Sequence, residues 1–147
     1  MTEKELQKYI KERFPKENES CEWKAFSNLK HDVSGCKGND VISYASAIAN
    51  MQGGNLIIGV EDKTLNITGI QNFHDYTPEN LPARMAGNCT HLVTEELYVE
   101  SHTTIDTNKT VWIIHIPKHA PRKPVIVHKQ AWQRLGDNLV KLTAERE

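Results

Sequence analysis

The sequence of 147 residues lacks several features that would assign a protein to a class at once. No apolar run approaches the roughly 20 residues that a membrane-spanning helix needs, and the first residues carry no apolar core of a secretion signal. A charge excess is also missing, because 18 lysines and arginines oppose 19 aspartates and glutamates, for a net charge of −1. We therefore expect a cytoplasmic protein without a membrane partner, in which any attraction for nucleic acid comes from a local basic patch.

Cysteine and histidine patterns typical of metal sites are absent as well. The 3 cysteines form no CxxC pair, and the 7 histidines show no ligand spacing such as HExxH. This argues against a zinc knuckle or a disulfide framework as the basis of the fold, and reduced thiols are expected. What is present is a globular composition with 38% hydrophobic and 25% charged residues, which suits one domain of this length.

The first half of the chain predicts two helices and two strands. Thr2 and Glu5 have the spacing of a capping box, and the apolar residues that follow recur at helical spacing up to Pro15. Residues 20–26 predict a strand with one solvent-exposed face, and residues 28–40 predict a loop. A second helix is expected to begin near Val41 and to end before the Gly53-Gly54 pair, followed by a buried strand at 56–58.

The second half predicts mainly strands. Thr77-Pro78 is a helix start, with a cap residue before a proline at the first helical position. Alternation over 97–105 predicts a strand with Glu100 and His102 on one side and Leu97, Val99 and Ile105 on the other, in a hairpin with an apolar central strand at 111–116. Two short strands follow at 125–127 and 131–135, and a helix is expected from Thr143 onward. The prediction is an α+β fold, a single compact domain whose mixed, mostly antiparallel sheet is packed by two to three helices.

The Gly53-Gly54 segment has two interpretations. Gly54 and Gly59 have the separation of a phosphate-binding loop, but Val60-Glu61 stands where that loop needs a lysine and a hydroxyl residue. The sequence therefore argues against P-loop ATP binding. It favours a tight helix-to-strand turn that the glycines permit.

An acidic group is the first candidate site. Glu22 and Lys24 share one face of the predicted strand, and Glu22 and Asp62 would converge if the strands at 20–26 and 54–60 lie side by side. Clustered carboxylates, with Glu17 nearby, could hold Mg²⁺ or Mn²⁺ and support phosphodiester cleavage, while Lys24 could hold a phosphate. The alternative is that these are ordinary solvated charges.

A basic group is the second candidate site. Lys118, Arg122 and Lys123 lie on a proline-bearing loop, and Arg134 follows on the next predicted hairpin. Trp132 lies between them and could stack on a base, so that the group would suit contact with phosphates. The alternative is a solvated loop over a core tryptophan.

Several segments, taken in order, resemble the Schlafen-type AlbA-like domain. Residues 17–24 resemble its E-x4-E-[FW]-K opening, and residues 47–62 (AIANMQGGNLIIGVED) resemble its central A-x-A-N-x-x-G-G-x-[LI]-x-[IV]-G-V-x-D signature. Its second G-I and its closing I-x...P...Y-x-R-x-G pattern are matched by Gly69-Ile70, Ile116-Pro117, Lys123-Pro124 and Trp132-Gln133-Arg134-Leu135-Gly136. The departures are a tryptophan at position 132, where tyrosine is common, and Asp137 after the last glycine.

The resemblance implies a DNA-binding α+β domain over residues 1–147, forming the N-terminal part of a longer protein similar to bacterial transcriptional regulators. In animal Schlafen proteins the domain cleaves transfer and ribosomal RNA with three carboxylates, which map onto Glu17, Glu22 and Asp62 here. Three functions stay open: nucleic-acid binding in transcription regulation, metal-dependent endoribonuclease activity with Mg²⁺ or Mn²⁺, and protein interaction or assembly. A homodimer is a further expectation, because joining two basic faces would strengthen weak binding.

Overall fold

The computed structural model describes residues 1–14, 21–24, 41–61, 64–70, 76–127, 130–135 and 138–141, with the backbone alone for 130, 133–135 and 138–141. The elements in chain order are α1 (Glu3–Arg13), β1 (Cys21–Lys24), α2 (Val41–Asn50), β2 (Gly54–Ile58), α3 (Leu81–Gly87), β3 (Tyr98–Thr103), β4 (Thr110–Ile116), β5 (Ile126–Val127), β6 (Gln130–Leu135) and β7 (Asn138–Lys141). No helix in these ranges is long and apolar enough to cross a bilayer.

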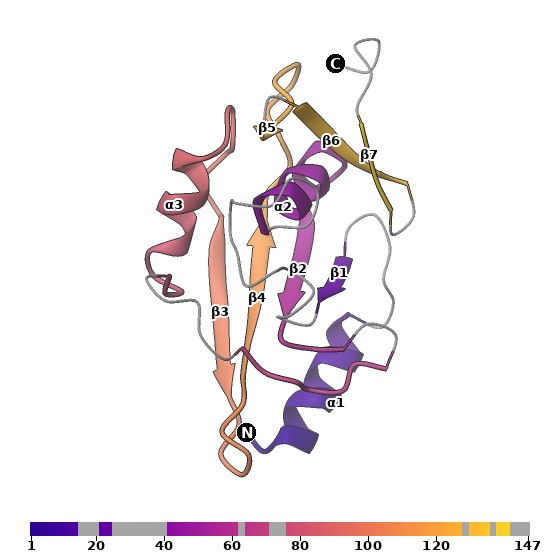
Figure 1. Ribbon diagram of the computed structural model, residues 1–147, viewed down its shortest axis with the longest axis vertical. Coiled ribbons are helices and arrows are strands. Elements are labelled where there is room, and N and C mark those ends of the chain that lie inside the picture. Colours follow the sequence, from indigo (N-terminus) through magenta and orange to yellow (C-terminus); the bar gives the residue numbers. More distant parts are fainter. Residues whose placement is uncertain are drawn as a thin grey trace.

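The strands form two sheets (Figure 1). In the larger one the order is β1-β2-β4-β3, where β1 pairs with β2 in parallel and the other two pairings are antiparallel. The smaller sheet has the order β5-β6-β7 and lies beyond α2. This confirms the predicted α+β class, the mixed sheet, the β3–β4 hairpin and the central position of β4.

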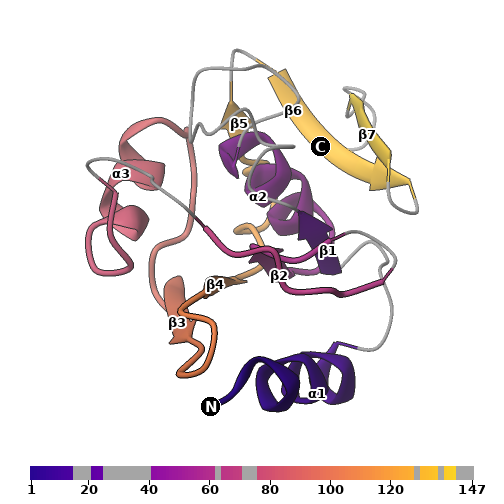
Figure 2. The ribbon, with the colours of Figure 1, turned by 60° about the horizontal axis from the view of Figure 1, so that its bottom comes forward.

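The larger sheet is covered on both faces, as Figure 2 shows, with α1 on one side and α2 on the other. Because side chains alternate along a strand, each face has its own apolar cluster. The α1 side contains Leu6, Ile10, Cys21, Trp23, Ile57, Val111 and Ile113. The α2 side contains Leu56, Ile58, Trp112, Ile114 and Ile116 with the buried residues of α2.

Covering both faces changes the expectation for β1. Residues 20–26 were predicted to have one solvent-exposed face, but Cys21, Glu22 and Trp23 are all buried and Lys24 is partly buried. The prediction was wrong because the alternation of polar and apolar residues reports polarity, whereas both sides of this strand lie under helices. Glu22 is consequently a carboxylate inside the protein.

The Gly53-Gly54 segment forms the tight turn between α2 and β2 that the sequence favoured. Gly53 has φ +79° and its N–H donates to the Ile48 carbonyl at 3.0 Å, which closes the end of α2. A Cβ at Gly53 would lie 2.7 Å from the Ile116 oxygen and 2.8 Å from the Lys118 nitrogen. Glycine is therefore required both by the positive φ and by the close approach of the chain after β4.

Three predicted boundaries differ from the structure. Thr77-Pro78 does not start a helix: the Thr77 hydroxyl and the Asn80 side chain accept hydrogen bonds from each other's N–H at 3.1 and 2.8 Å, which holds a turn before α3. The strand around Glu100 ends at Thr103, and Ile105 in the following turn is 77% exposed. The strand β7 was not predicted, since residues 138–141 carry little apolar alternation.

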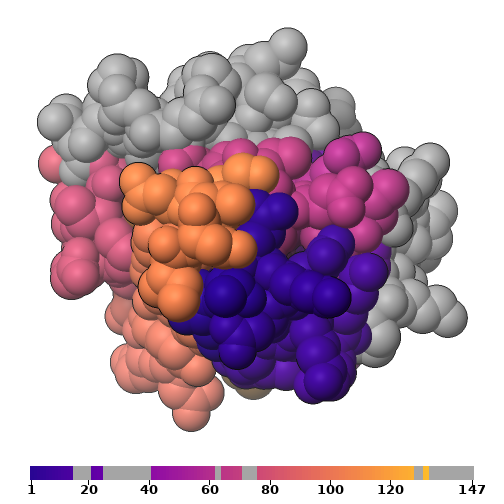
Figure 3. Space-filling model, turned by 90° about the horizontal axis from the view of Figure 1, so that it is seen from below, coloured from indigo at the N-terminus to yellow at the C-terminus, as the bar shows by residue number. Residues whose placement is uncertain are grey.

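The N-terminal helix begins as the sequence predicts. The Thr2 hydroxyl accepts from the Glu5 N–H, and the Glu5 carboxylate accepts from the Thr2 N–H, which confirms the capping box. This end of α1 lies against the β3–β4 turn (Figure 3), where the Glu3 N–H donates to Asp106 at 2.8 Å. The residues expected in the loop at 28–40 and in a helix from Thr143 lie outside the described ranges.

Candidate functional site

Glu22 and Lys24 lie on the same face of β1, as predicted, and form an ion pair beneath α2. The Lys24 Nζ is 3.2 Å from a Glu22 carboxylate oxygen, and the side chains are 18% and 2% exposed. The ammonium group also lies 4.8 Å from the centre of the Tyr44 ring. Burial acts to lower the Lys24 pKa, but the Tyr44 hydroxyl and the Glu22 charge outweigh it and raise this pKa above its ordinary value.

Of the carboxylates proposed as a metal site, Glu22 alone belongs to the described ranges. Glu17 and Asp62 lie outside them, so their approach to Glu22 stays a prediction, as does the binding of Mg²⁺ or Mn²⁺. The strands that would bring Glu22 and Asp62 together do lie side by side, since Glu22 pairs with Leu56 in the parallel β1–β2 register. Among the described residues, no three histidine, cysteine or acidic side chains are arranged to hold a metal ion.

The basic candidates Lys118, Arg122 and Lys123 share the loop between β4 and β5, which we call the basic loop (residues 117–124). All three side chains are exposed, and the ion pairs found within the described ranges join other residues. A bridge between Ala120 and Lys123 tightens the loop. Three cations therefore face solvent from a short, folded segment.

The basic loop is anchored to the C-terminal end of α2. The His119 N–H donates to the Ala49 carbonyl at 2.9 Å. Asn50 binds the following strands: its side-chain amide donates to the Val125 and Trp132 carbonyls at 3.0 and 2.7 Å and accepts from the Val125 N–H at 2.6 Å. These bonds give the asparagine of the A-x-A-N segment a positioning role, which the sequence alone did not indicate.

Trp132 belongs to the core. Its side chain is 9% exposed and packs in the cluster around α2, so the indole face is not available for stacking on a base. For Trp132 itself the core position is therefore the one observed, whereas the contact of the basic loop with phosphate stays a prediction. Arg134 lies in β6 with its side chain outside the description, and its contact with phosphate stays a prediction.

The structure separates Lys24 from the basic loop. Lys24 pairs with Ile58 at the last residue of β2, whereas Ile116, just before the basic loop, pairs with Gly54 at the first residue. The length of β2 thus lies between them, on the order of 13 Å for the steps of about 3.3 Å that separate the Cα atoms of its five residues. Lys24 is neither exposed like the loop cations nor next to them.

A network of polar side chains on the α1 side of the sheet was missed by sequence reasoning. Glu100 accepts hydrogen bonds from Tyr9 at 2.5 Å, from His102 at 2.5 Å and from His115 at 2.9 Å, and Arg13 lies 3.3 Å away. Burial acts to raise the Glu100 pKa, but the two histidines and Arg13 outweigh it and lower this pKa. The available signal was a histidine inside the otherwise apolar strand 111–116.

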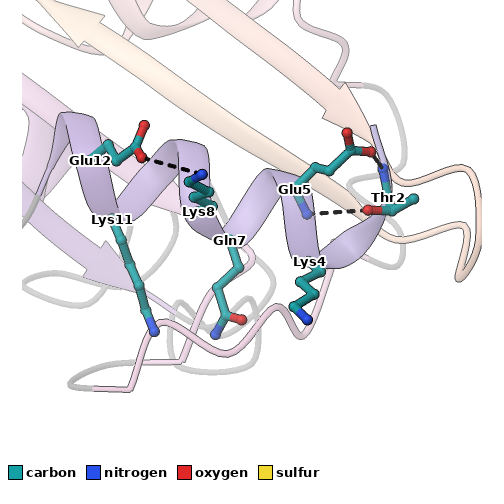
Figure 4. A pocket seen from close by; sticks show the side chains of 7 residues that line it. All are labelled: Thr2, Lys4, Glu5, Gln7, Lys8, Lys11 and Glu12. Atoms are coloured by element: carbon teal, nitrogen blue, oxygen red, sulfur yellow. Dashed lines mark hydrogen bonds and ion pairs between the residues drawn. The ribbon is translucent and has the colours of Figure 1, made fainter.

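The outer surface of α1 is a second basic region and borders a hollow of about 540 Å³ (Figure 4). Lys4 and Lys11 point to the same side as Gln7, and Lys8 lies beside Glu12 with 3.9 Å between the charged groups. Carboxylates thus alternate with lysines along this helix. Its field is largely balanced locally, unlike that of the basic loop.

One of the solved structures that the chain resembles, with a TM-score above 0.5, supports the fold. The chain is 19% identical to the DIP2311 protein from Corynebacterium diphtheriae, with a TM-score of 0.58, over 84% of this chain and 22% of that one. It thus spans about a fifth of the length of that protein. It is 18% identical to the N-terminal domain of a RecG-related protein from Nitrosomonas europaea, with a TM-score of 0.45, over 87% of this chain and 81% of that one.

No curated protein matches the sequence significantly. The model of the family described as "Schlafen, AlbA_2" matches residues 17–143. This range contains the opening, central and closing segments whose resemblance the sequence suggested, together with the basic loop and the β1–β2 pair. The chain therefore belongs to the Schlafen AlbA_2 family.

Proposed function

We propose that this domain binds nucleic acid, with DNA as the first candidate, through the basic loop. The observation that carries the proposal is the exposure of Lys118, Arg122 and Lys123 on one anchored segment, away from the ion pairs of the described residues. Lysine and arginine on a surface loop bind phosphate oxygens and release counterions. Membership of the family is consistent with this function.

The net charge of −1 sets the expected strength of binding. Because the whole molecule has no positive field, a single copy with three loop cations is expected to bind weakly and with marked salt dependence. Two copies would present two such loops and gain affinity through effective concentration. Dimerisation belongs to the proposal on this ground, and a monomeric mass at high protein concentration would count against it.

A role in transcription regulation, as the N-terminal part of a longer chain, is the finer form of the proposal. It predicts preference for a duplex DNA sequence over bulk DNA, measured by competition at physiological salt. Equal affinity for specific and random duplexes would contradict the role in transcription regulation but not the general proposal of nucleic-acid binding.

Binding is favoured over cleavage by the position of Glu22. A catalytic carboxylate must reach the metal ion or the scissile phosphate, whereas Glu22 is 2% exposed and paired with Lys24. Incubation with transfer RNA in Mn²⁺ or in chelator tests this choice. Mn²⁺-dependent cleavage that Glu22→Gln abolishes would replace the binding proposal by an endoribonuclease using Glu17, Glu22 and Asp62.

The direct test removes two loop cations. The double variant Arg122→Ala with Lys123→Ala should lower affinity for labelled DNA and RNA by roughly tenfold at low salt, as measured by fluorescence anisotropy. Lys8→Ala with Lys11→Ala removes the same charge from α1 and serves as the matched control. Unchanged affinity in the loop variant, or an equal loss in both variants, would overturn the assignment to the basic loop.

A further inference from the structure

A stacked aromatic pair, of which Tyr98 is the exposed member, joins the edge strand β3 to β4 close to the basic loop. Tyr98 in β3 is directly opposite His115 in β4. Their rings are stacked, with centroids 4.2 Å apart and an angle of 9° between the planes. Tyr98 is 52% exposed. Because His115 covers one face of the tyrosine ring, the exposed surface includes the other face.

Hydrogen bonds hold the His115 ring of this stack in place. The side-chain amide of Asn55 donates to His115 Nδ1 at 2.8 Å, so Nε2 carries the hydrogen that is donated to Glu100 at 2.9 Å. Glu100 is held in turn by Tyr9 and Arg13 from α1. A ring fixed in this way offers a preorganised stacking surface, which reduces the entropy lost when a planar ligand binds.

A hollow of about 380 Å³ adjoins the stacked pair. It is lined by Gly54, Asn55, Glu96, Tyr98, His115, Ile116 and Pro117, and its volume is in the range of small-ligand sites. The Asn55 Oδ1 and the exposed Glu96 carboxylate are hydrogen-bond acceptors. Acceptors beside an aromatic surface favour a planar ligand that carries an amino group.

The hollow continues into the basic loop along the chain. Pro117 lines the hollow, and the next residue, Lys118, is the first of the three exposed cations. Because Lys118 directly follows Pro117, with their Cα atoms about 3.8 Å apart, a strand whose phosphates bind the loop would pass beside the hollow that Tyr98 lines. Stacking on an aromatic ring beside a basic segment is the way in which single-stranded nucleic acid is bound.

We propose that this hollow is a subsite for one unpaired nucleobase, which stacks on the free face of Tyr98 and directs an amino group toward Asn55 and Glu96. The inference rests on the proposed function and deepens it. It makes an unpaired segment of nucleic acid, and not a continuous duplex, the ligand of this part of the surface. Bases with an exocyclic amino group are preferred over uracil or thymine.

The test compares strands and variants with the full chain. Tyr98→Ala should weaken binding of a labelled cytosine 12-mer by roughly tenfold, the range for one stacked base, and leave binding of a 12-base-pair duplex unchanged. Tyr98→Phe keeps the stack and should bind like the wild type. The wild type should bind the cytosine 12-mer more tightly than the uracil 12-mer, and Glu96→Gln with Asn55→Ser should reduce this difference.

The outcomes separate the subsite from the binding function. If Arg122→Ala with Lys123→Ala loses affinity but Tyr98→Ala keeps full affinity for single strands, the subsite is wrong and the basic loop stands. If Tyr98→Ala and Tyr98→Phe lose affinity equally, the ring does not act by stacking, and the subsite is wrong as well. If the wild type binds no oligonucleotide even at low salt, the proposed function itself is wrong.

Discussion

Positively charged side chains lie near both ends of β2, but they are largely buried at one end and exposed at the other. At its last residue the Lys24 ammonium lies against Glu22 and Tyr44 under α2, with 18% of its side chain exposed. Near the first residue of β2, the basic loop that follows β4 presents Lys118 and Arg122 to solvent. Lys24 therefore interacts with groups inside the protein, whereas the cations of the basic loop are available to a ligand.

The difference shows what a charged residue in a sequence does and does not reveal. Lys24 and Lys118 have the same chemistry, and both were reasonable phosphate contacts from the sequence. Their roles diverge because α2 covers the face of β1 that carries Glu22 and Lys24, whereas Lys118 lies exposed in the loop after β4. When both faces of a strand are covered, its charged side chains cannot reach an external ligand and pair with each other instead.

The largest effect is expected from breaking the ion pair on one side only. Lys24→Met leaves the buried Glu22 carboxylate without the ammonium group and should lower the free energy of unfolding by about 3 kcal/mol, measured by urea denaturation. Glu22→Leu combined with Lys24→Met removes both charges and should recover most of this loss. A Lys24→Met variant as stable as the wild type would show that Lys24 is a surface cation like those of the basic loop.

A smaller loss of stability is expected when Asn50, which anchors the segment after the basic loop, is replaced. Asn50→Ala removes three hydrogen bonds to the segment that follows the loop and should cost about 2 kcal/mol of stability. Because the loop loses its anchor, nucleic-acid affinity should also fall although no charge is removed. Asn66→Ala removes one exposed hydrogen bond, from Gln7, far from the loop in sequence; it is the control and should change stability little and affinity not at all. Unchanged affinity in a destabilised Asn50→Ala variant would mean that the loop needs no anchoring.

The smallest effect concerns alkaline pH. The pKa of Lys24 is raised above its ordinary value of 10.5, through the Tyr44 hydroxyl and Glu22 acting against burial. A raised folded-state pKa stabilises the protein at pH values below 10.5, and this contribution is lost as pH rises through the folded-state pKa. Urea denaturation at pH 9 and pH 11 should therefore show a decrease that is smaller in Lys24→Met. Identical decreases would contradict the assignment of Lys24 to the interior.

Local patterns predicted much of the fold. The Thr2–Glu5 capping box, the glycine turn at Gly53 and the apolar strand at 111–116 each depend on neighbouring residues, and each was confirmed. What failed depends on distant packing: the buried face of β1 and the turn at Thr77. Alternation and capping patterns say nothing about which helix covers a strand.

The candidate site was predictable in a similar, partial way. The basic loop could be located because lysine, arginine and proline occur together in the sequence. The stack of Tyr98 on His115 could not, because it joins residues from two strands whose register the sequence leaves open. Alternation alone places Tyr98, Glu100 and His102 on one face of β3, but only the register puts Tyr98 opposite His115.

The salt dependence of nucleic-acid binding tests the comparison most directly. Lys118→Gln, Arg122→Gln and Lys123→Gln together should reduce the slope of log affinity against log salt by about 2 to 3, since each phosphate contact contributes about 0.7–0.9. The charge-matched triple variant of α1, at Lys4, Lys8 and Lys11, should keep the wild-type slope. A wild-type slope in the loop variant, or an equal reduction in both variants, would contradict the assignment of phosphate binding to the basic loop.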